Sequence, residues 1–372
     1  MNSQVTSVDQ AYLARALELA EGGRGRVSPN PLVGAVIVQR GQVIGEGFHA
    51  ELGGLHAERA ALADCAARGE DPAGATLYVT LEPCAHHGRQ PPCVEAILEA
   101  GIGRVVIASD DPSEKAAGRG PGILRDGGVE VDFAAGAAAA AARRLNQPFR
   151  KHSRTGLPLV TLKLAISLDG QTRTAPGDSP WISGERSRAL VHRWRTESDA
   201  IAAGIGTVLG DDPLLSARPE GVENPRQPIR VVFDSQARLP LESQLLSTLD
   251  LSPVFVVVSP GADPSRVSAL QQAGAEVLTI SGPSPADRIT AALTDLGRRN
   301  ITSLFLEGGR TLASAFLAAD QIDVSETFIA PVLLGQSNPP LAGQDPPRRS
   351  ALESSQRAIG DDVLVTARFR EW

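Results

Sequence analysis

One histidine and two cysteines in the first hundred residues have the chemistry of a metal site. His56 stands two residues before Glu58, and Cys84 and Cys93 follow later in the chain. One imidazole and two thiolates are three of the four ligands of a tetrahedral Zn²⁺ site, and they leave the fourth position for water. The residue types therefore predict a catalytic zinc centre, since a structural site would be closed by a fourth protein ligand.

Glu58 is the residue expected to move protons at this centre. Two residues apart on a regular helix do not share a face, so we expect His56 at the start of a helix, with its ring toward the metal while Glu58 reaches the water. The pattern His-x-Glu followed by Pro-Cys-x-x-Cys is typical of zinc-dependent nucleoside and nucleobase deaminases, whose Glu shuttles protons and is not a ligand. Here eight residues, instead of two, separate Cys84 from Cys93.

Helices and strands that alternate along the chain must position these groups. Cys93 is expected at the start of a helix, where unpaired N–H groups and the helix dipole stabilise a thiolate. One crossover after another indicates a layered α/β domain. The expected helices are residues 8–21, 56–68 and 94–100, and the expected strands are residues 32–38, 42–49, 75–80 and 104–108.

Three segments, residues 29–34, 56–58 and 80–93, resemble the deaminase domain of the bifunctional riboflavin-biosynthesis deaminase-reductase family. The wide cysteine spacing belongs to that family's pattern. The resemblance implies a zinc cofactor and a pyrimidine ribonucleotide substrate, with Asn30 among the substrate contacts. In the family, Asn-Pro is expected where this chain has Ser113-Glu114, which weakens a substrate contact at that position but does not affect the zinc chemistry.

The residues of this first site also allow other interpretations. A closed zinc knuckle would need a fourth ligand, which His86, His87 or Cys65 could supply, although Cys65 is expected in the core. The polar loop between the two cysteines is either a wall of the substrate site or a solvated loop. Asn30, between two prolines, is either a contact to the substrate or an ordinary turn residue.

The resemblance continues into the second half, through residues 165–170, 178–183, 204–213 and 307–312. It implies a reductase domain whose fold is like that of dihydrofolate reductase and whose cofactor is NADPH. The implied cofactor contacts are Ala165, Trp181, Thr207, Asp211, Ser235, Gly309, Arg310, Thr311, Leu312, Ala313, Ser314 and Ala315. The implied substrate contacts are Ser179, Arg195, Leu215, Arg218 and Glu307.

The residues of the second half give weaker signals when taken alone. Gly308-Gly309, between a strand at residues 303–306 and a helix from Arg310, could seat a pyrophosphate on helix N–H groups or simply form a tight turn. Arg195 and Arg218 could bind a ribose phosphate in a bidentate way or be solvated at the surface. Lys163 is either an edge-strand residue or a cation near the hydride acceptor.

The length of 372 residues predicts two domains, because one core rarely exceeds about 300 residues. We expect a cytidine-deaminase-like three-layer α/β domain at residues 1–147 and a dihydrofolate-reductase-like α/β domain at residues 155–372. A basic, turn-rich linker is expected at residues 148–158. Each half should then have its own core and its own chemistry.

Composition limits the classes of function. With 42% apolar and 21% charged residues the chain is typical of a soluble globular protein, and a net charge of −7 argues against nucleic-acid and membrane-surface partners. No signal segment and no apolar run near 18 residues is found, so we expect a cytoplasmic protein. Three cysteines, two of them assigned to metal, fit a reducing compartment. A homo-oligomer, either a dimer or a tetramer, is also expected.

The leading interpretation is an enzyme that deaminates a pyrimidine ribonucleotide and then reduces its ribosyl group with NADPH. A base deaminase acting on single-stranded nucleic acid would need a basic groove with stacking aromatics, and aromatic residues make up only 4% of this acidic chain. A third possibility is a deaminase whose second domain senses a ligand without catalysis.

Overall fold

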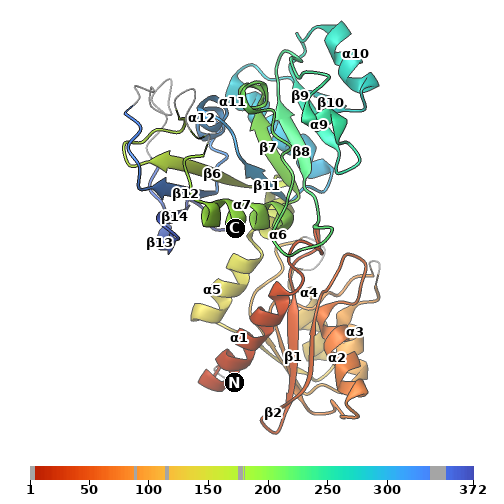
Figure 1. The fold of residues 1–372 in the computed structure, drawn as a ribbon. Coiled ribbons are helices and arrows are strands. Elements are labelled where there is room, and N and C mark those ends of the chain that lie inside the picture. Colours follow the sequence, from red (N-terminus) through yellow and green to blue (C-terminus); the bar gives the residue numbers. More distant parts are fainter. Residues whose placement is uncertain (1–4, 88–89, 114–116, 175–178, 180, 336–348) are drawn as a thin grey trace. The chain divides into compact units, whose positions relative to one another are not determined.

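The computed structural model describes residues 5–87, 90–113, 117–174, 179, 181–335 and 349–372. It divides into two compact units, Met1–Gly156 with Trp372, and Leu157–Glu371. Each unit has its own sheet and its own hydrophobic core. Figure 1 labels the elements, and each unit is described by itself below.

The first unit is built on a five-stranded sheet in the order β2-β1-β3-β4-β5. β1 is antiparallel to β2 and β3, whereas β3, β4 and β5 run parallel, so their carboxyl ends lie at one edge of the sheet. That edge is where open α/β sheets hold their ligands. The strands are β1 (Gly34–Gln39), β2 (Gln42–Phe48), β3 (Thr76–Val79), β4 (Arg104–Ile107) and β5 (Glu130–Phe133).

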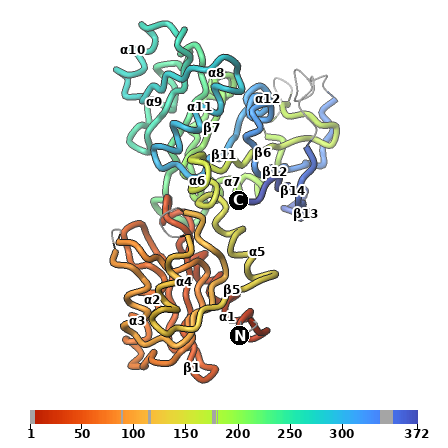
Figure 2. The backbone as a smooth tube through the Cα atoms, turned by 180° about the vertical axis from the view of Figure 1, so that it is seen from behind, coloured from red at the N-terminus to blue at the C-terminus, as the bar shows by residue number. Residues whose placement is uncertain are grey.

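Helices cover both faces of this sheet, as the continuous burial along β1 requires. Ala35 and Ile37 belong to the apolar cluster with α2, α3 and α4, and Val36 and Val38 to the cluster with α1 and α5. The two views in Figures 1 and 2 show α1 and α5 apart from α2 and α3. The helices are α1 (Ser7–Glu21), α2 (Ala57–Ala67), α3 (Cys93–Glu99), α4 (Arg119–Asp126) and α5 (Gly136–Leu145).

The expected linker at residues 148–158 is wrong over most of its length. The structure has a helix there, α6 (Gln147–Thr155), which ends at Gly156 in the left-handed conformation with φ 71°. Pro148 stands in the first turn of α6. Backbone N–H groups in that turn have no partner within the helix, so a proline there costs no hydrogen bond and favours helix initiation. Arg150 and Lys151 of α6 are buried. The basic residues of this segment therefore do not indicate a solvent-exposed linker.

The second unit is built on a nine-stranded sheet in the order β10-β9-β8-β7-β11-β6-β12-β14-β13. Seven neighbouring strands, from β10 to β12, are parallel, and the β13–β14 hairpin adds an antiparallel edge. The strands are β6 (Leu159–Ser167), β7 (Ala200–Gly204), β8 (Ile229–Phe233), β9 (Val254–Val258), β10 (Glu276–Thr279), β11 (Ser303–Leu306), β12 (Val324–Ala330), β13 (Glu353–Ile359) and β14 (Asp362–Arg368).

Helices pack on both faces of this sheet as well. Leu293 of α11 and Phe316 of α12 share a core with Val160 of β6, while α8, α9 and α10 share a separate core with the other face of β7, β8 and β9. The helices are α7 (Glu185–Glu197), α8 (Ile205–Asp211), α9 (Gln244–Ser247), α10 (Pro264–Gln272), α11 (Pro285–Arg298) and α12 (Arg310–Ala318). None of the helices in the described part of the chain has both the length and the apolar character needed to cross a bilayer.

Candidate active sites

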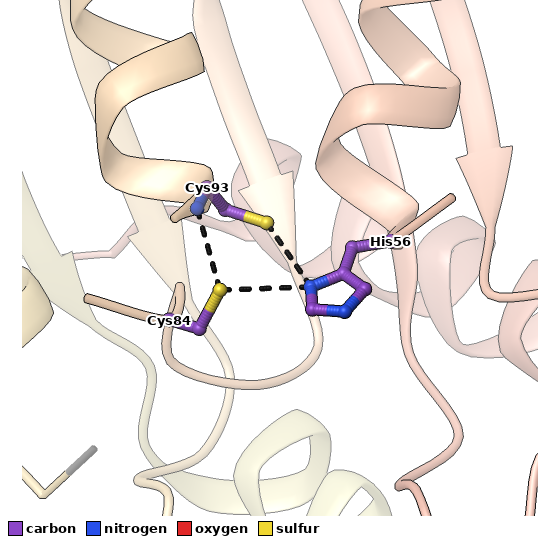
Figure 3. A group of neighbouring side chains, drawn as sticks. All are labelled: His56, Cys84 and Cys93. Atoms are coloured by element: carbon purple, nitrogen blue, oxygen red, sulfur yellow. Dashed lines mark hydrogen bonds between the residues drawn. The ribbon is translucent and has the colours of Figure 1, made fainter. Parts of the chain in front are cut away.

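The three predicted metal ligands come together in the first unit. Figure 3 shows His56 at the start of α2, Cys93 at the start of α3 and Cys84 in the segment after β3. Their ligand atoms all lie within 4.8 Å of one another. His56 precedes the first turn of α2 with an extended backbone, as the sequence predicted, so its ring is free to turn away from the helix surface.

The contacts among these three side chains fit a metal site. The Cys84 Sγ lies 3.5 Å and the Cys93 Sγ 3.4 Å from the His56 Nδ1, and the Cys93 backbone N–H donates to the Cys84 Sγ at 3.3 Å. Hydrogen bonds from Cys93 and from His56 lower the pKa of the Cys84 thiol to about 4. A thiolate is thus favoured where a zinc ion would need one, and metal binding would displace the protons of the imidazolium and of the second thiol to solvent.

Glu58 is buried beside this group. It is 4% exposed, and burial together with the negative charge of Cys84 raises the pKa of its carboxyl to about 7. A hydrogen bond joins its side chain to that of Cys93. A carboxyl that titrates near neutral pH can both take and return a proton, which is the property required of a general acid and base.

Close backbone packing holds α2 against β2. A Cβ at Gly47 of β2 would lie 2.3 Å from the backbone nitrogen of Ala61, so only glycine lets α2 lie this close to the sheet. The Arg59 guanidinium then donates to the Pro92 carbonyl at 3.0 Å, which ties the start of α2 to the residue before Cys93. These contacts fix the starts of α2 and α3 relative to each other, and with them the proposed ligands His56 and Cys93.

The alternative fourth ligands lie elsewhere. Cys65 is buried in the core, with its Sγ 3.4 Å from the Glu70 carbonyl, and His87 is exposed near Glu95. His86 faces Asp111, and its Nδ1 has no hydrogen-bond partner among the described residues. Within the described part of the chain, only His56, Cys84 and Cys93 are grouped as a metal site. Gly88 and Arg89 of the loop between the cysteines lie outside it.

Sequence reasoning overlooked His49, which connects the predicted substrate contact Asn30 to the metal group. The His49 Nε2 lies 3.1 Å from the Asn30 Nδ2, and its Nδ1 lies 2.9 Å from the Leu55 carbonyl. Its ring packs edge-on against that of His56, with centroids 5.5 Å apart. His49 follows β2 and is buried, and its position seven residues before His56 gave no pattern by which it could be recognised.

In the second unit, Arg195 of α7 and Glu307 after β11 form a bidentate ion pair. The Arg195 Nε donates to the Glu307 Oε1 at 2.6 Å and a terminal nitrogen donates to Oε2 at 2.9 Å, while the Ser216 carbonyl accepts a third bond at 2.8 Å. Burial acts to raise the pKa of Glu307, but the charge and hydrogen bonds of Arg195 hold it below its ordinary value. Glu307 is therefore a fixed negative charge.

Further cations face this pair. The charge of Lys163 acts on Glu307, and that of Arg218 acts on His192 and on Arg195. Arg195 and Lys163 thus act on the Glu307 carboxylate and Arg218 lies near Arg195, which leaves a net positive site suited to a phosphate. The edge-strand interpretation of Lys163 is wrong, because β6 lies between β11 and β12 in the sheet interior. His192 was not singled out from the sequence, since one histidine on a polar helix carries no motif.

Two helix N-termini meet at the carboxyl edge of the same sheet. α8 follows β7 and α12 follows β11, and each begins after a glycine, Gly204 or Gly309, with no side-chain cap. A Cβ at Gly309 would lie 3.4 Å from the Thr207 hydroxyl, and one at Gly204 would lie 3.5 Å from the Leu312 Cβ. Uncapped N–H groups at two adjacent helix starts fit the phosphates of a dinucleotide.

The residues implied for the second site differ in exposure. Trp181 is 61% exposed, the Arg188 guanidinium lies 5.1 Å from its ring centroid, and its backbone N–H donates to Ser179 at 3.3 Å. Leu215 is buried and Ala165 is partly buried in β6. Arg218, Asp211 at the end of α8 and Ser235 after β8 are exposed. Asp178 of the motif before Ser179 lies outside the described residues.

Two family models match the chain, one for each half. The model described as the cytidine and deoxycytidylate deaminase zinc-binding region matches residues 6–109, and that of the RibD C-terminal domain matches residues 158–365. The first range contains all three residues grouped as a metal site, and the second contains the Arg195–Glu307 pair.

Relatives match over nearly the full length. The riboflavin biosynthesis protein RibD of Actinobacillus pleuropneumoniae is 40% identical, over 98% of this chain and 96% of its own. The solved structure of Acinetobacter baumannii RibD is 36% identical with a TM-score of 0.84, covering 97% of this chain and 98% of that one.

The solved structure of a diaminohydroxyphosphoribosylaminopyrimidine deaminase/5-amino-6-(5-phosphoribosylamino)uracil reductase from Thermotoga maritima is 35% identical with a TM-score of 0.84, covering 98% of this chain and 99% of that one. The predicted α/β folds, cytidine-deaminase-like in the first half and dihydrofolate-reductase-like in the second, are confirmed by these matches. The chain therefore belongs to the RibD family of riboflavin-biosynthesis enzymes, and it joins a zinc-dependent deaminase domain to a reductase domain that uses NADPH.

Proposed function

We propose that this chain performs two consecutive steps on one pyrimidine ribonucleotide. The first is hydrolytic deamination of 2,5-diamino-6-(ribosylamino)pyrimidinone 5'-phosphate, and the second is reduction of its ribosyl group to a ribityl group. The deaminase and reductase activities for which the Thermotoga maritima relative is named support this assignment. The observation that carries it is the buried Glu58 beside the His56, Cys84 and Cys93 group.

In the deaminase domain we assign His56, Cys84 and Cys93 as ligands and Glu58 as the catalytic residue. A zinc ion held there supplies Lewis acidity and activates water as a nucleophile at neutral pH. Glu58 takes the proton from the attacking water and delivers it to the departing amino group, so that water is consumed and ammonia is released. Asn30, held by His49, offers an amide to the edge of the pyrimidine or ribose.

In the reductase domain we assign the Arg195–Glu307 pair, with Ser179, Leu215 and Arg218, to the substrate. NADPH, when bound, supplies the hydride for the ribosyl carbon. The basic side chains bind the phosphate, and Glu307 orients the Arg195 fork through two hydrogen bonds. The residues assigned to the cofactor are Ala165, Trp181, Thr207, Asp211, Ser235 and Gly309 to Ala315.

The test follows both reactions with the purified full-length protein. Added substrate should release ammonia, and NADPH absorbance should fall only after deamination has begun. Supplying the deaminated aminopyrimidine should restore NADPH oxidation in the presence of a zinc chelator. Ammonia release without NADPH consumption in either assay would contradict a catalytic second domain and favour a ligand-sensing one.

We also propose that the protein is a cytoplasmic homo-oligomer. The three cysteines are free thiols, which suits a reducing compartment. Among the described strands β13 pairs only with β14, and six of its seven residues are exposed on an edge that a second copy of this chain could extend. Light scattering should give a multiple of the 38.9 kDa chain mass, and Ser355→Pro in β13 should lower it.

A further inference from the structure

Arg150 is a fully buried arginine of the first unit that neither proposed reaction uses. It is 1% exposed, and its Nε donates to the Trp372 carbonyl at 2.6 Å. One terminal nitrogen donates to the Ser109 hydroxyl at 3.1 Å and to the Asp110 carbonyl at 2.8 Å, and the other to the Asp110 carboxylate at 3.3 Å. A single guanidinium therefore joins α6 and Trp372 to the segment after β4.

Trp372 is held in place by α6, although it lies 222 positions beyond Arg150. Its backbone N–H donates to the Gln147 Oε1 at 2.9 Å, and the Gln147 amide nitrogen donates to its carbonyl at 3.3 Å. The Lys151 ammonium lies 5.4 Å from the centroid of its ring. The carbonyl that orients Arg150 thus has a defined position within the first unit.

The segment that Arg150 holds lies next to the proposed deaminase site. Ser109 follows β4, whose parallel neighbour β3 leads to Cys84, and the Glu82 backbone N–H donates to the Ser109 carbonyl at 3.0 Å. The Glu82 carboxylate in turn accepts a hydrogen bond from the Asp111 backbone. Residues 109–113 are therefore bonded to the chain that carries a metal ligand, at the ligand-binding edge of the sheet.

We propose that Arg150, oriented by Gln147 and Trp372, is a positioning residue for the deaminase reaction, which fixes residues 109–113 as a wall of the substrate site. The inference rests on the proposed deaminase function. A rigid wall reduces the loss of conformational freedom when substrate binds, so loosening it weakens substrate binding more than it slows the chemical step.

The test uses Arg150→Lys in the full-length protein. Lysine keeps the charge but loses the planar fork that reaches three partners together. The KM for deamination should rise about tenfold with a smaller change in kcat, as expected when an oriented contact is lost. Zinc content and NADPH-dependent reduction of the deaminated aminopyrimidine should stay unchanged. Amide hydrogen exchange should become faster at residues 109–113.

Arg104→Lys is the matched control. Arg104 lies at the amino end of β4, the strand that Ser109 follows, and donates hydrogen bonds to Asp9 and Asp132 at 2.9 Å. This variant should lower stability without raising the KM or the exchange of residues 109–113. Trp372→Ala provides a second variant, with a KM increase in the same direction, whereas Trp372→Phe should restore near wild-type values by keeping an aromatic ring over Lys151.

Two outcomes would overturn the proposal. Wild-type KM and wild-type exchange in Arg150→Lys would show that Arg150 only stabilises the fold. An equal KM increase in Arg104→Lys would show that general destabilisation causes the effect. If the wild-type protein deaminates nothing, the proposed function fails, and the exchange of residues 109–113 still decides whether Arg150 positions them.

Discussion

The two proposed sites differ in how far along the chain their residues lie. His56 and Cys84 are 28 positions apart and Cys84 and Cys93 are nine apart, whereas Arg195 and Glu307 are separated by 112 positions. The deaminase group is positioned by the starts of two helices and by the segment that follows β3. The reductase pair meets only because α7 packs against β11, where Trp194 contacts Phe305, in a sheet whose order differs from chain order. The proposed metal site is thus formed by residues that lie close together in the chain, while the charged pair depends on how the fold arranges distant elements.

The glutamates of the two proposed sites differ in the charge of their neighbours. Burial and then the negative charge of Cys84 raise the pKa of the Glu58 carboxyl to about 7, whereas Arg195 outweighs burial at Glu307 and lowers its pKa. Burial acts in the same direction on both, so the charge of the neighbour decides the outcome. Glu58 can exchange a proton at neutral pH, and Glu307 serves as a permanent charge.

The largest expected effect is that of Glu58→Gln. The amide has almost the same shape but cannot take up a proton, so deamination should fall by about 10²- to 10⁴-fold. Zinc content measured by atomic emission should be unchanged, and the deaminated aminopyrimidine should still be reduced with NADPH. Loss of zinc would make Glu58 a ligand, and loss of reductase activity with an intact fold would mean that the two sites are coupled.

Cys93→Ser tests the local site through its metal. A hydroxyl is a much poorer zinc ligand than a thiolate, so zinc occupancy and deamination should fall together. Cys65→Ser is the control, because Cys65 lies in the core away from the ligands, and it should keep its zinc. Full occupancy in Cys93→Ser would indicate that another residue, with His86 the first candidate, completes the ligand set.

Arg195→Lys tests the site that topology assembles. Lysine cannot form both bonds to Glu307, and a lost hydrogen bond to a charged group costs about 1.5–3 kcal/mol, so kcat/KM of the reductase should fall by about 10- to 100-fold. Deamination should not change. Arg226→Lys, which alters a comparable pair with Asp199 in the same unit, should leave reductase kinetics near wild type. An equal loss in both variants would contradict the assignment of Arg195.

The smallest expected effect is a pH dependence in the second unit. Burial, followed by the charges of Arg195 and Arg218, lowers the pKa of His192 from 6.5 to about 4. Between these values the unfolded chain holds a proton that the folded chain does not, so stability should fall as pH drops from 6.5 toward 4. Urea unfolding at pH 5 and pH 7.5 should show a smaller decrease for His192→Gln than for wild type. Equal decreases would mean that His192 is not coupled to this cationic site.

Most of the fold class could be predicted from the sequence, because the alternation of helices and strands depends on local patterns. The start of α2 just after His56 and of α3 at Cys93 followed from helix geometry and from the prolines before Cys93. The linker prediction failed at Pro148, because a proline that breaks a helix interior is favoured in its first turn. Local chemistry alone does not distinguish these two positions.

The sequence by itself determined the metal chemistry, because ligand type and spacing are properties of residues that lie close together in the chain. Only the tertiary structure decided that Lys163 lies in an interior strand, that His49 and His192 face the two sites, and that Trp372 belongs with Arg150. These relations depend on strand order and on contacts across more than a hundred positions in several cases. No periodicity or short sequence motif predicts these relations, since they arise only when packing of a hydrophobic core brings distant segments together.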